Sequence, residues 1–336
     1  MARARCDRRN GRDGAGVTRF GFIRELGLLP ALVVIVLAGA LINNKFLTPI
    51  NVVNVLANTS ALALLVLGET LVLIAGKFDL SLESIVGLAP AMGLMLVLPV
   101  AARGWGIDLP VAVGLVAMLA LGALVGAFNG ALVVRLRLNA FIVTLAMLII
   151  LRGLLLGMTH GETLFEVPDA YLFLGAATVA GLPVSVWLTA LCYVAAALFL
   201  RYHRFGRALY AIGGNAQAAR AAGIRVGRVT IGAYVVAGLL AAVAGLIMCG
   251  RVGAVAANQG NGWIFNVFAA AVIGGVSLDG GKGTMFGALT GALLLNVVDN
   301  LLTLAQVETF WIQAIYGGII LLALMFSRLT NRAEQV

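Results

Sequence analysis

The sequence is poor in the side chains that most enzymes use for catalysis and metal binding. It holds three cysteines, Cys6, Cys192 and Cys249, and two histidines, His160 and His203. No Cys-x-x-Cys pair occurs, and neither histidine has a cysteine or a second histidine at metal-ligand spacing. Three scattered cysteines are also too few for a disulfide framework. The sequence therefore predicts no catalytic residue, no metal site and no cofactor in this chain.

Charged residues are also scarce. They make up 11% of the chain, against 62% hydrophobic residues. A soluble domain of this length could not bury so much apolar surface, so the bilayer must be its solvent. The formal net charge of +9 could suggest nucleic acid, but the basic residues sit in tails and loops, where they meet anionic lipid headgroups. We therefore expect an all-α, polytopic integral membrane protein that contacts membrane lipid and no nucleic acid.

A nucleotide-binding loop is missing as well. The stretch 274–283 is rich in glycine and contains Lys282, but Val276 stands where a phosphate loop needs its first glycine. Gly283 follows the lysine where the loop needs Ser or Thr. The chain shows no sign of binding ATP itself.

What the chain has in abundance is apolar runs of membrane-spanning length. Taking about 20 residues per span, we expect about eight to ten transmembrane helices. The candidate segments are 26–44, 53–75, 83–101, 110–134, 139–158, 172–200, 229–250, 264–278, 285–306 and 310–327. Segment 264–278 is short, and 172–200 is interrupted at 181–183. Residues 26–327 thus form one transmembrane domain between a basic tail, 1–25, and a shorter tail, 328–336.

The distribution of arginine predicts the orientation of these spans. With the N-terminal tail inside, Arg135, Arg137, the loop 201–228 and the C-terminal tail all fall on the inner side. The opposite loop 159–171 carries acidic residues instead, Glu162, Glu166 and Asp169. This asymmetry follows the positive-inside rule, with Arg103 and Arg251 as exceptions at outer ends. Both termini are therefore expected to be cytoplasmic.

The longest polar interval, 199–229, contains several arginines and no acidic residue. Within it, Asn215 precedes good helix formers and Gly223 follows them, which predicts a short helix with both caps. Gly213 and Gly214 would let the backbone turn sharply into that helix. The arginines by themselves can be explained by topology alone. A small-residue face that topology does not require favours docking of a partner; it consists of Ala216, Ala219, Ala222 and Gly223.

Two interior stretches, 76–84 and 274–283, break the apolar pattern. Each follows a span, pairs an Asp with a Lys and a Ser, and leads into a helix rich in Gly and Ala. Both fall on the same side of the membrane, which would fit an internal parallel repeat. Non-helical backbone near the membrane must be satisfied by protein or by a water-filled cavity. These stretches are therefore expected to line a path or to pack between helices.

Neutral polar side chains are commoner in the spans than charged ones. Asn and Thr can hydrogen-bond a neutral polyhydroxyl solute without the desolvation cost of a charge. The residues expected to line or shape a solute path are Asp79, Ser81, Asn129, Thr144, Asn266 and Ser277. An equally good interpretation is that such side chains hold the helices together. Among the charged groups, Glu69 lies within a span, and Arg152 either pairs with it or snorkels.

Glycines recur at spacings of four in two regions. Residues at this spacing share one helix face, where helix backbones can approach closely. Tight packing within one chain explains the pattern better than a cofactor site does, and a contact between two copies stays open. The glycines are Gly114, Gly122, Gly126 and Gly130, and later Gly283, Gly287 and Gly291.

Four stretches carry a family resemblance that runs from about residue 46 to residue 324. They are LGETLVLIAGKFDLSLESIVGLAPA (67–91), GAFNGALVVRLRLNAFIVTLAMLIILRGL (126–154), FGRALYAIGGNAQAARAAGI (205–224) and AAAVIGGVSLDGGKGTMFGALTGALLLNVVDNLL (269–302). With these motifs the chain resembles the permease subunits of bacterial ABC importers for monosaccharides, of the ribose and xylose type.

The resemblance implies a permease in the bacterial inner membrane that works with other proteins. These are two cytoplasmic ATPase subunits, which bind the ATP and Mg, a periplasmic or lipid-anchored solute-binding protein, and a second permease copy or a paralogue. It also implies that the loop 199–229 couples the permease to the ATPase. The residues that carry this role are Gly206, Arg207, Gly213, Gly214, Asn215, Arg220 and Gly223.

The chain departs from the family pattern at several positions. The family usually has Gly-Gly-x-Asp-Leu-Ser where this chain has Gly-Lys-Phe-Asp-Leu-Ser (76–81), so Lys77 replaces the second Gly. Asn139 stands where Pro is usual, and Ile264 and Asn266 stand where an acidic pair is common. These segments lie near the expected path, so the solute is left open among a pentose, a hexose, a sugar alcohol and a signalling furanose. Two other classes of protein are alternatives: an ion-coupled secondary transporter, and a membrane enzyme with a catalytic set that the sequence does not show.

Overall fold

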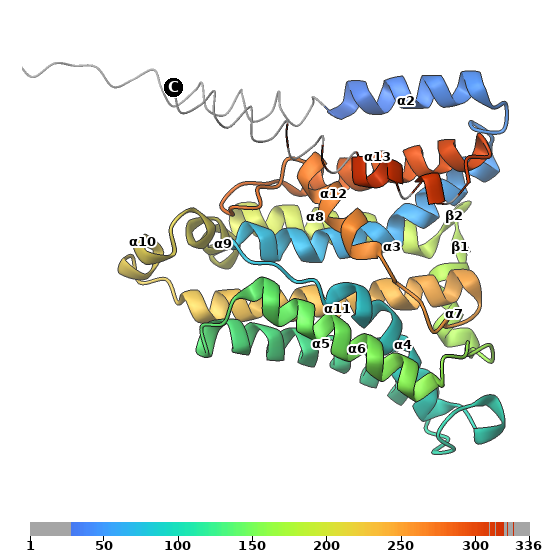
Figure 1. Ribbon diagram of the computed structural model, residues 1–336, viewed down its shortest axis with the longest axis horizontal. Helices are drawn as coiled ribbons and strands as arrows, with labels where there is room; N and C mark the ends of the chain where they lie inside the picture. The colour runs from blue at the N-terminus through green and yellow to red at the C-terminus, as the bar shows by residue number, and fades with distance from the viewer. Residues whose placement is uncertain (1–27, 309, 313, 319–320, 322–324, 326–336) are drawn as a thin grey trace, which may run out of the picture.

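The computed structural model describes residues 28–308, 310–312, 314–318, 321 and 325 (Figure 1). The predicted tails, 1–25 and 328–336, lie outside the described residues, as does part of the candidate span 310–327. In the described part the regular secondary structure is almost entirely α-helical. The other regular elements are a 3-10 turn, η1 (Val100–Ala102), and two short antiparallel strands, β1 (Thr178–Val179) and β2 (Leu182–Pro183).

Six of the described helices are long and apolar enough to cross a membrane. They are α3 (Pro49–Ile74), α5 (Val111–Arg135), α6 (Ala140–Thr159), α8 (Val184–Tyr202), α11 (Val226–Val252) and α13 (Met285–Leu304). Three shorter apolar helices accompany them: α2 (Leu28–Ile42), α4 (Leu82–Val97) and α12 (Trp263–Ile273). The predicted fold class, an all-α polytopic membrane protein, is confirmed. The expected count of about eight to ten spans included the segments that form the shorter helices. These helices are too short to cross a membrane by themselves.

The interrupted segment 172–200 is two elements rather than one span. A short helix, α7 (Asp169–Ala176), is followed by the strand pair, and α8 begins after Pro183. Ala180 and Gly181 have φ values of +52° and +79°, so the chain turns there in the left-handed region. The break that the sequence predicted at 181–183 is therefore present, and it divides the segment completely.

Two helices, α3 and α11, form the centre of the bundle. Every residue of α3 from Thr59 to Ile74 is buried, as expected for a helix that is apolar on all sides. Figure 1 shows α13, α8 and α12 on one side of this pair and α5, α6 and α4 on the other. The outer helices keep large apolar side chains exposed, for example Phe128, Ile149 and Leu191. In a membrane protein such surfaces face lipid or another membrane subunit.

The glycine faces bring these helices into backbone contact. A Cβ at Gly126 would lie 2.1 Å from the carbonyl oxygen of Tyr234, and one at Gly122 would lie 2.4 Å from that of Gly238, so α5 packs directly on α11. A Cβ at Gly287 would lie 2.1 Å from the carbonyl oxygen of Gly274. The predicted packing role is confirmed for these residues. Gly283 is different, because it precedes α13 and has a φ of +145°, so it belongs to a loop and not to the helix face.

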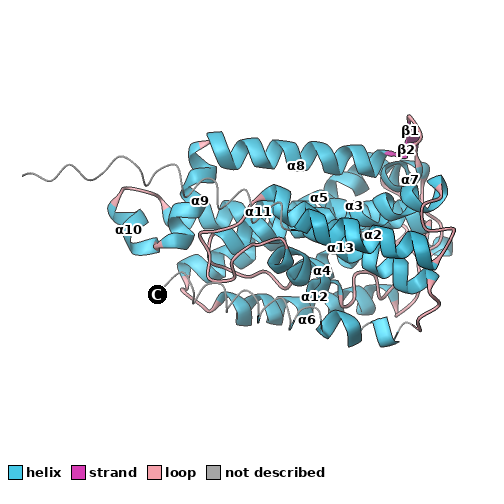
Figure 2. Ribbon diagram, turned by 90° about the horizontal axis from the view of Figure 1, so that it is seen from above, coloured by secondary structure: helices cyan, strands magenta, loops and turns pink. Residues whose placement is uncertain are grey.

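The connections gather at the two ends of the bundle. At one end lie α9 (Arg204–Gly214) and α10 (Ala216–Ala221), and at the other lie α7 and the strand pair (Figures 1 and 2). Arg103 pairs with Glu162, and Leu164 forms a β-bridge with Val255, which ties the loops of the second end together. The basic interval 199–229 and the acidic loop 159–171 are thus at opposite ends, as the charge pattern predicted. Which end faces the cytoplasm stays a prediction.

Candidate functional site

We call the interval 199–229 the coupling segment. The short helix predicted within it is present as α10. The Asn215 side chain accepts hydrogen bonds from the backbone N–H groups of Gln217 (2.9 Å) and Ala218 (3.0 Å), which satisfies donors that the first turn leaves unpaired. Gly223 follows the helix with a φ of +81°. Both caps lie where the sequence placed them, because capping depends on residues a few positions apart.

A second helix, α9, precedes α10 and was missed. A sharp turn was predicted at Gly213 and Gly214, but both residues lie at the end of α9 and neither has a positive φ. The turn occurs at Asn215, whose backbone is extended (φ −161°). A signal for α9 exists, because Phe205, Leu209 and Ile212 recur at helical spacing.

The expected small-residue face of α10 is only partly buried. Ala219 is buried, whereas Ala222 and Gly223 are exposed. Of the other residues assigned to coupling, Gly206 is buried where α9 meets α8, and a Cβ there would lie 2.4 Å from the Phe199 carbonyl oxygen. The Arg207 guanidinium donates to the Tyr202 carbonyl oxygen (3.0 Å). Gly206 and Arg207 therefore fix the α8–α9 corner, while Arg220 stays exposed on α10.

The inner face of α9 meets both interior stretches. A Cβ at Gly213 would lie 1.9 Å from the Ile74 carbonyl oxygen and 2.3 Å from the Gly281 nitrogen. That same Gly281 N–H donates to the Ile74 carbonyl oxygen (2.9 Å). A Cβ at Gly280 would lie 2.7 Å from the Gly76 Cα. We call this contact of Gly76, Gly213, Gly280 and Gly281 the glycine junction. It joins the coupling segment to the end of α3 and to the loop between α12 and α13 without intervening side chains.

A pocket of about 530 Å³ separates the coupling segment from the loops beside it. Gly214, Asn215 and Arg220 line it from the coupling segment, and Lys77 and Arg137 line it from the bundle. A Cβ at Gly214 would meet nothing within 4 Å, so this glycine borders open space while its neighbour Gly213 is tightly packed.

Three of the expected path residues form one buried network. Ser81 donates from its hydroxyl (2.6 Å) and its N–H (3.1 Å) to Asp79 Oδ1, and Asn129 Nδ2 donates to the Ser81 hydroxyl (2.8 Å). The Asp79 N–H donates to Glu69 Oε1 (3.2 Å). All four residues are fully buried. The network connects α3, the loop before α4, and α5.

The other three expected path residues lie elsewhere. Thr144 is fully buried, and its hydroxyl donates to the Ala140 carbonyl oxygen of its own helix (2.8 Å). Ser277 accepts a hydrogen bond from the Asp279 N–H inside its loop (3.2 Å). Asn266 lies on α12 and lines a polar pocket. The structure thus separates the six residues into a buried network, two local bonds and one pocket wall.

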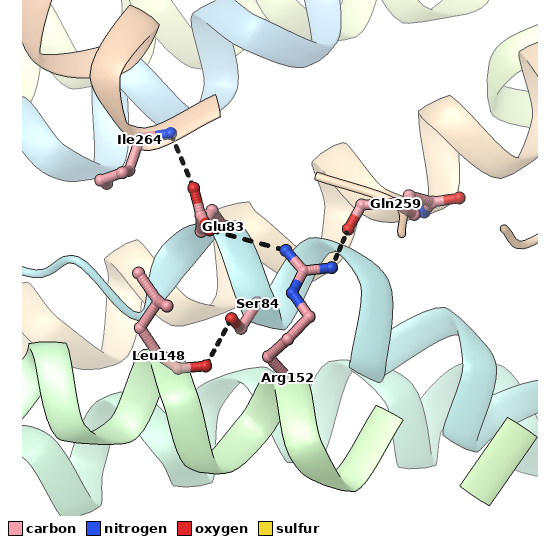
Figure 3. Close-up of polar contacts among 6 residues, drawn as sticks. All are labelled: Glu83, Ser84, Leu148, Arg152, Gln259 and Ile264. Atoms are coloured by element: carbon pink, nitrogen blue, oxygen red, sulfur yellow. Dashed lines mark hydrogen bonds and ion pairs between the residues drawn. The ribbon is translucent and has the colours of Figure 1, made fainter. Parts of the chain in front are cut away.

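Arg152 does not pair with Glu69, contrary to one of the two predictions for it. Its guanidinium lies 3.6 Å from Glu83 and donates to the Gln259 carbonyl oxygen (3.0 Å) (Figure 3). The second oxygen of Glu83 accepts from the N–H of Ile264 (3.1 Å), in the first turn of α12. Glu83 itself lies in the first turn of α4. The carboxylate therefore sits at the N-terminal ends of two short helices, where the helix dipoles favour a negative charge.

Gln259 completes this group, which we call the anchor cluster: Glu83, Arg152, Gln259 and the backbone of Ile264. The Gln259 side-chain amide donates to the carbonyl oxygens of Val86 (2.9 Å) and Gly245 (3.2 Å). The cluster thereby ties α4, α6, α11 and the start of α12 together. Its position fixes the α12 residues that follow Gly262.

Two of these α12 residues, Trp263 and Asn266, form one wall of a polar pocket of about 400 Å³. The pocket lies between α3, α11, α12 and α13. Apolar residues such as Leu62 and Met248 form part of its lining. The aromatic, amide and charged side chains on its wall are Trp263, Tyr316, Asn58, Asn266, Asn296, Arg251 and Asp299. Arg251 donates to Asn58 Oδ1 (2.8 Å), and the Tyr316 hydroxyl donates to Asp299 (2.8 Å). Both charged groups are thus held by neutral partners on the pocket wall.

Of these asparagines, Asn266 was predicted from the sequence to line a solute path, but the pocket as a whole was not predicted. One partial signal exists, because Asn296 and Asp299 lie three residues apart on α13 and therefore share a face. Nothing in the spacing relates them to Trp263 or Arg251, which lie on other helices.

Comparison with known proteins agrees with this architecture. The family described as branched-chain amino acid transport system / permease component matches residues 51–326. The ribose import permease protein of Escherichia coli strain K12 is 36% identical over 312 residues, which cover 92% of this chain and 94% of that protein. The corresponding protein of Haemophilus influenzae is 30% identical over 90% of this chain and 93% of that protein.

A third relative is named for a different solute. The autoinducer 2 import system permease protein of Shigella flexneri is 34% identical over 304 residues, covering 90% of this chain and 86% of that protein. No solved structure matches the chain. These relatives support an importer permease and not the ion-coupled transporter that the sequence left as an alternative. The chain therefore belongs to this family of multi-pass membrane permeases, the transport subunits of ABC importers.

Proposed function

We propose that this chain forms the membrane path of an importer for a small neutral polyhydroxyl solute of the sugar class. The relatives named for ribose and autoinducer 2 import support an importer, and their two solutes leave the exact one open. The permease itself performs no covalent chemistry. Separate ATPase subunits bind ATP and Mg and drive the change between outward and inward access.

The observation that carries the proposal is the polar pocket. Its volume of about 400 Å³ falls in the range of small-molecule sites. The Asn266 amide makes no hydrogen bond within the described residues and is available to hydroxyl groups of a solute. Trp263 offers a flat apolar surface beside it, which suits the C–H face of a sugar ring. The two charged groups already have partners, so the pocket favours a neutral solute over an ion.

The remaining path residues act on the shape of the bundle in this proposal. Asp79, Ser81 and Asn129 fix the start of α4 against α5, because their hydrogen bonds join the two elements. Thr144 and Ser277 hold local backbone in α6 and in the loop before α13. Asn266 is the member of the set that would touch solute directly.

The coupling segment transmits the motion of the ATPase subunits. Arg220 and the exposed side of α10 face outward, where a partner can grip them, and the glycine junction links α9 to α3 and to the loop before α13. A push on α9 therefore moves the ends of two helices whose other residues line the polar pocket, Asn58 of α3 and Asn296 of α13. In this proposal the coupling segment lies on the cytoplasmic side of a bacterial inner membrane, with both termini there.

Other partners follow from the same proposal. The opposite end, with α7 and the strand pair, would receive the solute from a periplasmic or lipid-anchored solute-binding protein. The exposed apolar faces of the outer helices would contact lipid and a second permease copy or a paralogue.

The test is to purify the tagged chain gently from its own host, and to measure uptake in the same cells. We expect an ABC ATPase to co-purify with the wild-type chain and to be lost from Arg220→Glu, together with uptake. Arg103→Gln is the control for ATPase binding, because it removes a charge at the opposite end and should retain the ATPase. Uptake that persists without any ATPase and collapses with an uncoupler would overturn the proposal.

A further inference from the structure

Two acidic side chains are buried next to each other in the centre of the bundle. Glu69 lies on α3 and Asp79 in the loop before α4, and both have an exposed fraction of 0%. The Asp79 N–H donates to Glu69 Oε1 (3.2 Å), which brings the two residues into direct contact. Carboxylates are almost never fully buried unless they are paired with a positive charge.

No cationic side chain pairs with them among the described residues. Neither the ion pair Arg103–Glu162 nor the ion pair Arg152–Glu83 includes Glu69 or Asp79. Lys77 is close in sequence, but it lines the pocket at the coupling segment. From α11, the titratable group that faces this pair is Tyr234, whose hydroxyl donates to the Phe78 carbonyl oxygen (2.8 Å). Two adjacent negative charges would therefore be buried without compensation.

Three buried side-chain oxygens of Glu69, Asp79 and Asn129 lack a hydrogen-bond donor among the described residues. Glu69 Oε2 and Asp79 Oδ2 are buried and accept no hydrogen bond from any residue that the structure describes. Asn129 Oδ1 is in the same condition. The orientation of the Asn129 amide is fixed by the network, because the Ser81 hydroxyl donates to Asp79 and must accept from the Asn129 NH₂ group. A buried acceptor without a donor is costly, so this place calls for a positively charged or donating ligand.

We propose that Glu69 and Asp79, with the Asn129 carbonyl oxygen beside them, bind one monovalent cation, a proton or a sodium ion. A single positive charge relieves the repulsion between the carboxylates and satisfies the oxygens that lack donors. A proton does so by turning one carboxyl group into a donor, and a sodium ion does so by direct coordination. The cation stabilises the junction between α3, the loop before α4, and α5, and it does not have to move with the solute.

The test is the thermal unfolding of the purified protein in detergent, compared between the wild type and Glu69→Gln. If the ligand is a proton, the wild-type unfolding temperature falls as the pH rises, because the proton is bound in the folded state and lost in alkaline buffer. If it is sodium, the unfolding temperature rises when sodium replaces a large organic cation at constant ionic strength. Glu69→Gln removes one of the two charges and should weaken the dependence in either case.

Glu166→Gln, on the exposed loop, is the matched control and should keep the dependence of the wild type. Equal responses of the wild type and Glu69→Gln to both pH and sodium would overturn the proposal. If Glu69→Gln does not fold, Asp79→Asn replaces it. If neither folds, the wild type decides: infrared absorption of a protonated carboxyl group or retained radioactive sodium supports the site, and the absence of both refutes it. Because the readout is stability, the result is independent of whether the proposed transport function is correct.

Discussion

At the scale of single residues, two arginine–glutamate ion pairs differ in how deeply their side chains are buried. Arg152 and Glu83 have side chains only 15% and 5% exposed, whereas Arg103 and Glu162 are 54% and 52% exposed. Water screens the second pair but not the first. Glu83 also depends on the guanidinium because its remaining partner, the Ile264 N–H, is neutral. The energetic role of an arginine in this protein is thus set by burial.

Replacing Arg152 with Met should therefore destabilise the protein by about 3–5 kcal/mol, because it leaves a buried carboxylate without its counter-charge. The measurement is unfolding in detergent, followed by tryptophan fluorescence. Arg103→Met removes the same charge at the exposed pair and should cost at most about 1 kcal/mol. Similar losses in the two variants would show that Glu83 is not held by Arg152.

At the scale of elements, α12 is a short helix whose position is determined from its first turn. Its 11 residues are too few to span the bilayer, and the anchor cluster holds its start. The helix then divides its side chains between two environments. Trp263 and Asn266 line the polar pocket, while Phe265 is 64% exposed on another face. Substitutions on the two faces of α12 can therefore distinguish an effect on solute contact from an effect on the stability of the helix.

Trp263→Ala should raise the solute concentration for half-maximal uptake by about tenfold or more, since a buried aromatic contact at a site is typically worth more than 1 kcal/mol. Phe265→Ala makes the same kind of truncation outside the pocket and should leave the half-maximal concentration unchanged. The measurement is uptake of labelled solute in whole cells at matched membrane abundance. Equal effects at the two positions would remove the pocket from the solute path.

The contact between α9 and the bundle can be tested at two adjacent glycines, Gly213 inside the glycine junction and Gly214 outside it. Gly213→Ala should abolish or strongly reduce uptake while the ATPase still co-purifies, because the added Cβ would lie 1.9 Å from the Ile74 carbonyl oxygen and force α9 away from the junction. Gly214→Ala adds the same methyl group where no atom lies within 4 Å, and should retain uptake. If Gly213→Ala transports normally, the junction does not transmit the motion.

At the scale of the whole molecule, the two ends of the bundle differ in charge and in construction. One end carries the arginine-rich coupling segment, and the other carries the acidic loop and the strand pair. Because the positive-inside rule assigns the arginine-rich end to the cytoplasm, the molecule has one expected orientation.

Cysteine labelling checks this orientation. Ala218→Cys on α10 and Glu166→Cys on the opposite loop are both at exposed positions. In a Cys6→Ser background, a membrane-impermeant thiol reagent added to intact spheroplasts should label Glu166→Cys and not Ala218→Cys. Inverted membrane vesicles should give the reverse pattern. Labelling of Ala218→Cys from outside would show that the coupling segment faces the wrong side for an ATPase.

Several features of this protein follow from neighbouring residues alone. The apolar runs determine an all-α membrane fold, because a chain in lipid must satisfy its backbone within helices. The caps of α10 follow from Asn215 and Gly223, and the division of segment 172–200 follows from the turn residues at 181–183. The glycine spacing on α5 determines which face packs closely. Each of these depends on interactions over a few positions, which sequence spacing specifies directly.

The candidate sites depend on contacts that no spacing specifies. Glu83 reaches Ile264 across 181 positions, and Arg251 reaches Asn58 across 193. The sequence offered Glu69 as a partner of Arg152 and did not relate Arg152 to Glu83, which lies 69 positions away; only the packing of α4 against α6 brings Glu83 within 3.6 Å of the guanidinium. Local patterns therefore determined the helices and their caps, while the tertiary structure decided which buried charges are paired and where the polar pocket lies, because both depend on which helix faces meet.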